Sequence, residues 1–354
     1  MRENAPPAEA IPADSSRGAM NVPLLDVRGL RKYFPVKAQQ IGGRRLVVQA
    51  VDDVSFAITE GETLGIVGES GCGKSTTARL LMRLIAPDAG EITFGGRPAL
   101  TAGGLSLREL RRSMQMVFQD SYASLNPRLA VADTIAFGPR AHGVSREQAR
   151  AKARELLQLV KLDPDQFGPR YPHQLSGGQR QRVNFARALA LEPRLVILDE
   201  AVSALDKSIE AQVLNLLMDL KKDLLLTYLF ISHDLNVVQY ISDRVLVMYL
   251  GKVVEYGPVE EIYHRPKHPY TRALLASRPS MNPDVKLEQS PITGDPPNPI
   301  NPPSGCRFRT RCAFAEPVCE RVEPRLHDLR VTQHTVACHM SIPGSGHSRR
   351  EVES

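Results

Sequence analysis

The sequence has 354 residues, of which 42% are hydrophobic and 24% are charged, proportions that are ordinary for a soluble globular protein. Its formal net charge of +6 is a mild basic excess. Such an excess is compatible with binding to a nucleic acid or to an anionic membrane surface, and also with no anionic partner at all. The longest apolar runs, at 224–231 and 244–251, are far shorter than the roughly 20 residues that cross a bilayer, so we expect no membrane-spanning helix.

The first residues of the chain are rich in Pro, Ala and Ser. They lack the apolar core of a secretory signal, so residues 1–22 are predicted to form a disordered leader, with Met20 as an alternative start. We therefore expect a cytoplasmic chain. Thiols stay reduced in that compartment, so the five cysteines are not first interpreted as disulfides.

Residues 23–263 alternate short apolar runs with segments in which apolar residues recur at helical spacing. Continuous apolar runs are typical of strands that are buried on both faces of a parallel sheet. The candidate strands are 63–67, 194–199, 227–232 and 244–250, and the candidate helices are 145–160 and 207–224. The pattern predicts an α/β fold with a mostly parallel sheet covered by helices.

The stretch GESGCGKST follows the first of these strands and matches the phosphate-loop pattern G-x-x-x-x-G-K-[ST]. Its glycines let backbone N–H groups surround the phosphates of a nucleotide, while Lys74 neutralises the outer phosphates and Ser75 ligates Mg²⁺. A tight glycine turn that caps a helix is the alternative, and Cys72 is predicted to be inert. The predicted nucleotide-binding residues here are Gly68, Glu69, Ser70, Gly71, Cys72, Gly73, Lys74, Ser75 and Thr76.

Two acidic residues, Asp199 and Glu200, end the apolar run RLVILDE. A phosphate loop needs a carboxylate at the end of a neighbouring strand to hold Mg²⁺, and Asp199 fits that role. Glu200 fits a base that polarises the attacking water. Alone, the pair could simply be acids at a strand end. Together with the phosphate loop, it predicts nucleotide hydrolysis.

The stretch LSGGQ at 175–179 resembles the signature of ABC-transporter ATPases, and further motifs of that family follow the same order along the chain. VFQD places Gln119 as the Q-loop glutamine, SALD places Asp206 in the D-loop, and ISHD places His233 as the switch histidine. The resemblance covers about residues 24–263.

This resemblance implies a P-loop ABC-type nucleotide-binding domain with a helical subdomain, and it implies ATP and Mg²⁺ as cofactors. A histidine at a strand end is more often structural, but the motif order favours a contact of His233 with the γ-phosphate. The catalytic residues implied are Glu200, His233 and Gln119, and the Mg²⁺ ligands implied are Ser75, Gln119 and Asp199.

The signature offers a second anion site, because Ser176 and the N–H groups around Gly177 and Gly178 lie at a predicted helix start. Gln179 completes the motif. Within one chain this site has no phosphate to hold. In the family it completes the nucleotide pocket of a second ATPase subunit, so the resemblance implies two ATP molecules held between two cassettes, which are either identical or sister chains.

Two adjacent aromatic residues, Tyr33 and Phe34, lie in RKYFPVK near the beginning of the domain. The family places an aromatic ring against adenine in this region. The resemblance favours Phe34 for that role, Tyr33 stays the alternative, and a core position is the other interpretation of either ring.

Two further segments, 118–128 and 260–279, resemble the ATP-binding subunits of dipeptide and oligopeptide importers, whose relatives also import nickel and glutathione. HPYTRALL within the second segment is also compatible with an ordinary amphipathic helix. The resemblance implies two membrane permease subunits as partners, an extracytoplasmic peptide-binding protein as an indirect partner, and a peripheral position on the cytoplasmic face of the membrane.

The C-terminal segment carries four cysteines with the spacing C-x5-C-x6-C-x18-C. Four thiols in a reduced compartment favour metal ligation over disulfides. Importer ATPases with similar tails imply a [4Fe–4S] cluster; zinc and four unliganded thiols are the alternatives. The candidate ligands are Cys306, Cys312, Cys319 and Cys338. The arginines between the first cysteines are interpreted as a solvated face that could also meet lipid headgroups: Arg307, Arg309 and Arg311.

The expected organisation is a leader over 1–22, an ABC ATPase cassette over 23–263, a cysteine-bearing extension over 264–341 and a polar tail over 342–354. The leading hypothesis is an ATPase that drives peptide import. A soluble ABC ATPase that acts on nucleic acid is the alternative from another class, but the importer-like tail and the single cassette argue against it, so no nucleic acid partner is expected.

Overall fold

The computed structural model describes residues 22–36, 46–99, 101, 103–278, 294–329 and 333–349. Nearly all of the predicted leader, the Pro-rich segment 279–293 and the last residues of the predicted tail lie outside the described residues.

The larger sheet has eight strands in the order β11-β12-β10-β9-β3-β8-β7-β6. Five adjacent strands of this sheet run parallel to one another: β9, β3, β8, β7 and β6. Three of them are buried along their whole length, namely β3, β7 and β8. This confirms the parallel sheet that the continuous apolar runs predict. The strands are β3 (Thr63–Val67), β6 (Met114–Val117), β7 (Leu195–Asp199), β8 (Thr227–Ile231), β9 (Arg244–Tyr249), β10 (Lys252–Pro258), β11 (His327–Asp328) and β12 (Thr335–Val336).

A second sheet of four antiparallel strands, in the order β2-β1-β4-β5, is built mainly from the N-terminal part of the chain. The pairing of β1 with β2 is interrupted by three register shifts, and these disturb the alternation of apolar and polar residues that would mark the strands in the sequence. The strands are β1 (Leu25–Pro35), β2 (Val47–Ile58), β4 (Ala89–Phe94) and β5 (Arg97–Pro98).

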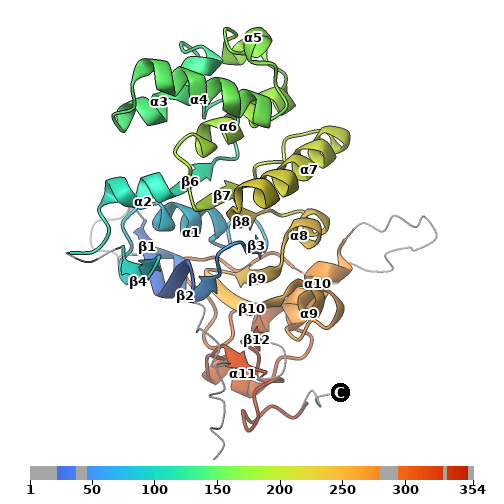
Figure 1. Ribbon diagram of the computed structural model, residues 1–354. Helices are drawn as coiled ribbons and strands as arrows, with labels where there is room; N and C mark the ends of the chain where they lie inside the picture. The colour runs from blue at the N-terminus through green and yellow to red at the C-terminus, as the bar shows by residue number, and fades with distance from the viewer. Residues whose placement is uncertain are drawn as a thin grey trace, which may run out of the picture.

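The helices form two groups. In Figure 1, α3 to α6 gather at one end of the molecule, beyond β6 and β7, and form a helical subdomain, whereas α7 to α10 flank the larger sheet. The predicted helices at 145–160 and 207–224 are confirmed as α4 and α7. The helices are α1 (Lys74–Leu81), α2 (Leu107–Ser113), α3 (Val131–Ala141), α4 (Arg146–Leu159), α5 (Pro164–Phe167), α6 (Gly177–Leu189), α7 (Lys207–Leu224), α8 (Leu235–Ile241), α9 (Val259–His264), α10 (Pro269–Ala276) and α11 (Pro317–Arg321).

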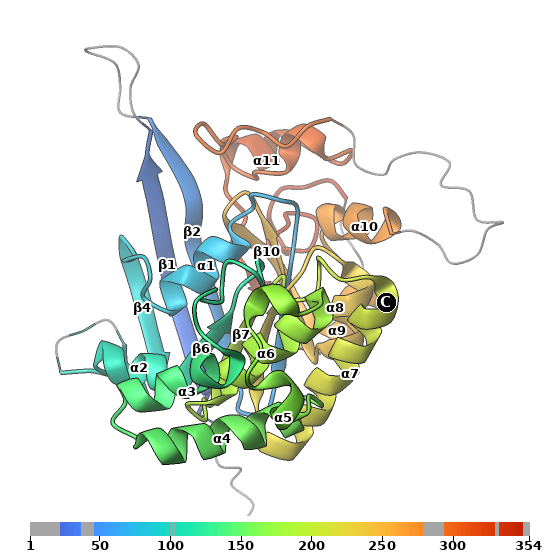
Figure 2. The same ribbon diagram turned by 90° about the horizontal axis from the view of Figure 1, so that it is seen from above.

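The cysteine-bearing segment packs against the sheet rather than standing apart from it. Its strand β12 pairs with β10, and Figure 2 shows α10 and α11 on the side of the molecule that also carries β10 and β2. Residues 342–349 contact this segment as well: His347 is buried, and Ser348 donates a hydrogen bond from its backbone N–H to Glu316.

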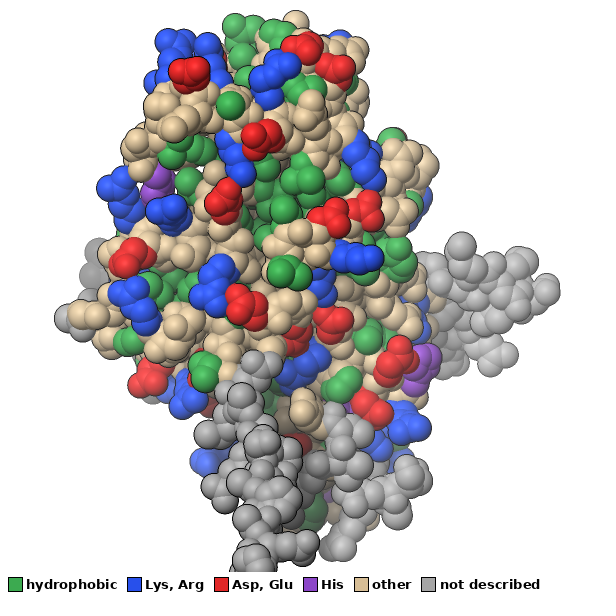
Figure 3. All heavy atoms as spheres, in the orientation of Figure 1, with side chains coloured by type: hydrophobic (Ala, Val, Ile, Leu, Met, Phe, Trp, Pro, Cys, Tyr) green, Lys and Arg blue, Asp and Glu red, His purple; other side chains and the backbone are tan. Residues whose placement is uncertain are grey.

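Charged side chains of both signs are interspersed with apolar ones on the face of the molecule in Figure 3. None of the described helices combines the length and the apolar character that crossing a bilayer requires.

Candidate active site

The phosphate loop joins β3 to α1, and its glycines are required by close approach to neighbouring strands. Gly68 and Gly73 have φ angles of 149° and 110°, in the region that favours glycine. A Cβ atom on Gly68 would lie 2.2 Å from the carbonyl oxygen of Met248, and one on Gly73 would lie 2.3 Å from that of Ala50. The loop therefore lies directly against β9 and β2, and a side chain at either glycine would push it away from these strands.

Lys74 lies inside the curve of this loop. Its side chain is only 5% exposed, and its ammonium donates hydrogen bonds to the carbonyl oxygens of Gly68 and Glu69 at 2.7 and 3.1 Å. The neighbouring thiol of Cys72 is also buried, and burial raises its pKa, so the thiol stays protonated at neutral pH. The loop thus holds a single cation where a polyphosphate would bind.

Two of the predicted Mg²⁺ ligands meet directly. Ser75, near the beginning of α1, donates a hydrogen bond from its hydroxyl to Asp199 Oδ1 at 2.8 Å. Asp199 ends β7 and is 3% exposed, and this burial raises the pKa of its carboxyl group. A hydroxyl and a carboxylate are hard oxygen donors of the kind that Mg²⁺ prefers, so this pair fits the metal.

Residues from two other loops approach the carboxylate of Glu200. Gln119 Nε2 donates a hydrogen bond to Glu200 Oε2 at 2.8 Å, and His233 Nδ1 lies 3.5 Å from the same oxygen. Glu200 has a φ angle of 48°, which is uncommon for a residue with a side chain and is a form of strain that concentrates at functional sites. The three residues predicted to be catalytic are therefore together, beside the Ser75–Asp199 pair.

The signature forms the start of α6 in the helical subdomain. Ser176 is the N-cap: its hydroxyl accepts a hydrogen bond from the backbone N–H of Gln179, whose side chain bonds the N–H of Ser176 in return. A Cβ on Gly178 would lie 2.6 Å from Ile209 Cγ2 on α7, while Gly177 has more room. Among the described residues, no hydrogen bond joins this segment to the phosphate loop. Asp206, which precedes α7, is also exposed.

The two candidate adenine-stacking rings are neighbours on β1 and so point to opposite faces of that strand. Tyr33 donates a hydrogen bond from its hydroxyl to Asp52 Oδ1 at 2.6 Å, while Phe34 has the ammonium of Lys32 5.6 Å from its ring centre. The choice between them stays a prediction. The engagement of the Tyr33 hydroxyl by Asp52 favours Phe34.

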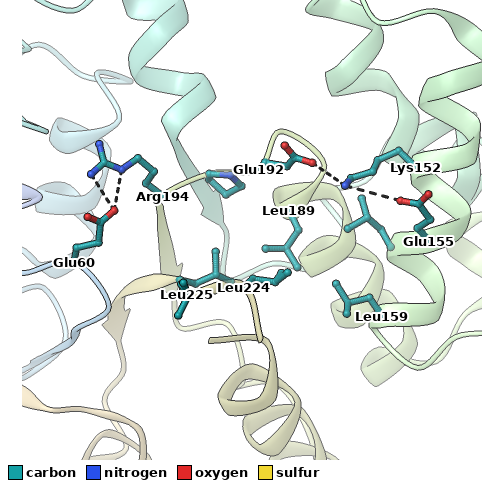
Figure 4. Close-up of a pocket in the computed structure, with 12 residues that line it drawn as sticks. Glu60, Lys152, Glu155, Leu159, Leu189, Glu192, Arg194, Leu224 and Leu225 are labelled. Atoms are coloured by element: carbon teal, nitrogen blue, oxygen red, sulfur yellow. Dashed lines mark hydrogen bonds and ion pairs between the residues drawn. The ribbon is translucent and has the colours of Figure 1, made fainter. Parts of the chain in front are cut away.

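A cavity of about 560 Å³ lies away from these residues, between the helical subdomain and the sheet. Figure 4 shows Arg194 paired with Glu60 on one side and Lys152 paired with Glu192 on the other. Arg194 immediately precedes β7, whereas Asp199 ends it, and a strand rises roughly 3.3 Å per residue. The cavity is thus at the opposite end of β7 from the predicted Mg²⁺ ligands and is distinct from the predicted nucleotide site.

The four cysteines of the extension line one small cavity of about 20 Å³, little more than a single water molecule occupies. Burial raises the pKa of Cys306 to about 12 and that of Cys338 to about 11. Across the described residues, no three Cys, His, Asp or Glu side chains form a group that could hold a metal ion. The metal site that the spacing predicts is therefore not supported by this arrangement.

Two arginines of the same turn are not the solvated face that the sequence suggests. Arg307 is buried and bonds Asp52 on β2, and Arg311, 6% exposed, pairs with Glu69 of the phosphate loop. Only Arg309 remains partly exposed, bonded within its own turn to Ser304. The partners of Arg307 and Arg311 lie more than 240 residues earlier in the chain, so no local sequence pattern could have identified these pairs.

Residues 51–203 match the family described as ABC transporter, and residues 254–319 match the one described as oligopeptide/dipeptide transporter, C-terminal region. The chain is 49% identical over 317 residues to a putative peptide import ATP-binding protein of Brucella ovis, covering 89% of this chain and 97% of that protein. It is also 49% identical over 321 residues to the oligopeptide transport ATP-binding protein AppF of Bacillus subtilis, covering 90% and 97%.

Solved structures of ATP-binding cassettes share the fold. Subunit cbiO1 of Clostridium perfringens, part of an ABC transporter complex, has a TM-score of 0.58 and 27% identity, covering 69% of this chain and 91% of its own. A dimeric ATP-binding cassette in a post-hydrolysis state with ADP and Pi has a TM-score of 0.57 and 28% identity, covering 66% and 98%. By the identity and the coverage of these relatives, the chain belongs to the family of ABC-transporter ATP-binding proteins that carry the oligopeptide/dipeptide transporter C-terminal region.

Proposed function

We propose that the chain is the ATP-hydrolysing subunit of an ABC importer that takes up dipeptides or oligopeptides. The observation that carries the proposal is the convergence of Gln119 and His233 on the carboxylate of Glu200, next to the bonded pair of Ser75 and Asp199. A base beside a hard-oxygen metal site and a phosphate loop is an arrangement for phosphoryl transfer to water.

In the proposed reaction, Lys74 and the N–H groups of the phosphate loop hold the terminal phosphates of ATP. When bound by Ser75 and Asp199, Mg²⁺ neutralises charge on those phosphates. Glu200 accepts a proton from water as the water oxygen forms a bond to the γ-phosphorus and the bond from that phosphorus to the bridging oxygen breaks. Gln119 and His233 orient the base. Gln119 would also be a ligand of the Mg²⁺, and His233 would also contact the γ-phosphate. The products are ADP and inorganic phosphate.

A second ATPase subunit, either a copy of this chain or a sister chain, completes the site in the proposal. Ser176 is exposed, and the backbone N–H groups of Gly177 and Gly178 lie at the start of α6 outside the Ser176–Gln179 capping bonds. Among the described residues, no hydrogen bond joins them to the phosphate loop of the same chain. Gly177, Gly178 and Gln179 of one subunit, with Asp206, would face the nucleotide of the other. The similarity to a cassette whose solved structure is a dimer supports this arrangement.

Peptides are the proposed cargo because relatives at 49% identity are named for peptide or oligopeptide import. Two membrane permeases are the proposed partners, with a peptide-binding protein outside the membrane, and the subunit would lie peripherally on the cytoplasmic face. Nickel and glutathione stay the alternative cargoes. The cassette is assigned to 23–263 and the extension to 264–341, followed by the tail 342–354.

Purification of the native complex tests this function. We expect two multi-span permeases to copurify with the chain, and we expect ATP hydrolysis in proteoliposomes to rise when the binding protein is loaded with short peptides. Nickel and glutathione serve as control solutes. Stimulation by either of them alone would reassign the cargo, and stimulation by nucleic acid in the absence of permeases would contradict an importer.

The metal prediction for the four cysteines is a separate part of the proposal. Their convergence on one cavity supports a shared ligand, although a metal would require the thiols to move closer together and to lose protons. The spacing predicts iron and sulfide in equal amounts in anaerobically purified protein, with zinc as the alternative, and loss of the metal in Cys319→Ser. Cys72→Ser is the matched control, because Cys72 lies in the cassette and is not one of the four candidate ligands; this variant should keep the metal. Protein without iron or zinc, whose four thiols all react with a labelling reagent, would contradict the prediction.

A further inference from the structure

One residue of the phosphate loop is contacted twice by the C-terminal extension. The guanidinium of Arg311 donates two hydrogen bonds to the carboxylate of Glu69, Nη1 to Oε2 at 2.8 Å and Nη2 to Oε1 at 3.1 Å. This two-pronged geometry fixes both side chains more tightly than a single bond. Because the side chain of Arg311 is 6% exposed and that of Glu69 is 23% exposed, water screens the pair only partly.

The second contact comes from α10. The backbone N–H of Glu69 donates a hydrogen bond to the hydroxyl of Tyr270 at 2.9 Å, and Tyr270 is fully buried. Its ring lies 4.6 Å from that of Tyr249 at the end of β9, and 5.4 Å from that of Phe308, centre to centre. Phe308 belongs to the same turn as Arg311, so the packing of these aromatic rings fixes the position of the turn next to the phosphate loop.

Charge gives a reason for the ion pair. Glu69 directly follows the first glycine of the loop proposed to bind polyphosphate, and charges interact over about 8 Å at physiological salt, so a carboxylate in this loop acts on a bound nucleotide. An unpaired carboxylate there would repel the nucleotide. Arg311 cancels that charge and holds the carboxylate on the side of the loop that faces the extension.

We propose that Arg311 is a positioning residue for nucleotide binding, through which the cysteine-bearing extension sets the affinity of the phosphate loop of its own chain for ATP. The inference rests on the proposed function in one respect, namely that residues 68–76 bind ATP. It assigns to the extension a role inside the nucleotide site, in addition to any role in assembly.

Equilibrium binding of a fluorescent ATP analogue tests the proposal, measured on full-length protein in its complex. We expect Arg311→Gln to raise the Kd about tenfold, the usual scale for loss of a hydrogen-bonded charged partner. The KM for ATP should rise with it while kcat changes little, because Arg311 touches none of the catalytic groups. Arg311→Lys keeps the charge, so its Kd should lie between those of the unmodified protein and Arg311→Gln. The rise in Kd of Arg311→Gln should become smaller in high salt.

Arg309→Gln is the matched control, because Arg309 lies in the same turn but bonds Ser304 and Glu320 rather than the cassette. It should bind ATP as the unmodified protein does. The decisive variant is the double change Glu69→Gln with Arg311→Gln, which removes the repelling charge together with its partner. We expect it to recover most of the lost affinity, which a merely distorted turn would not do.

The proposal is overturned if Arg311→Gln binds the analogue as tightly as the unmodified protein, or if Glu69→Gln restores nothing to it. Either result leaves ATP binding by the unmodified protein intact and so leaves the proposed function standing. Failure of the unmodified protein itself to bind the analogue would instead contradict the proposed function.

Discussion

We expect Glu200→Gln to lower ATP hydrolysis by roughly 10²–10⁴-fold, the usual contribution of a positioned acid or base, and to leave ATP binding intact. The substitution keeps the size of the side chain and an oxygen that can accept the bond from Gln119, now 2.8 Å from Glu200 Oε2, but it removes the group that takes the proton from water. ATP-bound dimers should then accumulate. Phosphate release by the assembled transporter, together with the amount of retained nucleotide, measures both effects.

Glu192→Gln is a matched control for this prediction. Glu192 also has a left-handed backbone, with a φ angle of 52°, but its side chain is 74% exposed and pairs with Lys152 far from the phosphate loop. An exposed ion pair contributes at most about 1 kcal/mol, so turnover should be unchanged. Near-normal turnover by Glu200→Gln would show that another group activates the water.

We expect Ser176→Arg to abolish hydrolysis in the pocket that its signature is proposed to complete, with a loss of at least about 10²-fold, the scale for loss of a positioned anion-stabilising donor. The arginine occupies the space at the start of α6 where the partner's nucleotide is proposed to bind. In a complex with a sister ATPase, the phosphate loop of the altered chain should still close on the sister's intact signature. Labelling with a photoreactive nucleotide, read for each subunit, distinguishes the two pockets.

Loss of the N-cap alone must be separated from loss of the signature, because replacing a capping serine costs about 1 kcal/mol of stability. Ser106→Arg is the control, since Ser106 caps α2 through the same reciprocal pair of bonds, with Glu109. It should lose similar stability and retain hydrolysis. Equal loss of nucleotide at both pockets in Ser176→Arg would contradict the shared-site arrangement.

The parts of the fold and site that could be predicted from the sequence are those encoded locally. Strands β3, β7 and β8 are continuous apolar runs, and the turns that follow them carry the motif residues, so the order of motifs was enough to predict a site at one edge of the sheet. The hydrogen bond from Gln119 to Glu200 and the approach of His233 to the same carboxylate agree with that expectation.

The parts that could not be predicted depend on pairing between distant segments. The register shifts of β1 against β2 hide the antiparallel sheet, and nothing near Arg311 in the sequence indicates that its partner is Glu69. The four cysteines illustrate the converse limit. Their spacing suggests a ligand, but spacing alone does not reveal whether the thiols are charged or how much room lies between them.

The pairing of β12 with β10 has a consequence for synthesis of the protein. Glu255 on β10 is completely buried, and its carboxylate accepts bonds from the backbone N–H groups of Lys267 and His268 and lies 2.7 Å from His334 Nε2. Thr335 of β12 pairs with Tyr256 of β10 and lies 79 residues after it in the chain. Because translation adds roughly 5–20 residues per second, β10 leaves the ribosome several seconds before β12. During that interval a strand edge and a carboxylate are uncovered, and a nascent chain in that state is open to pairing with the wrong strand.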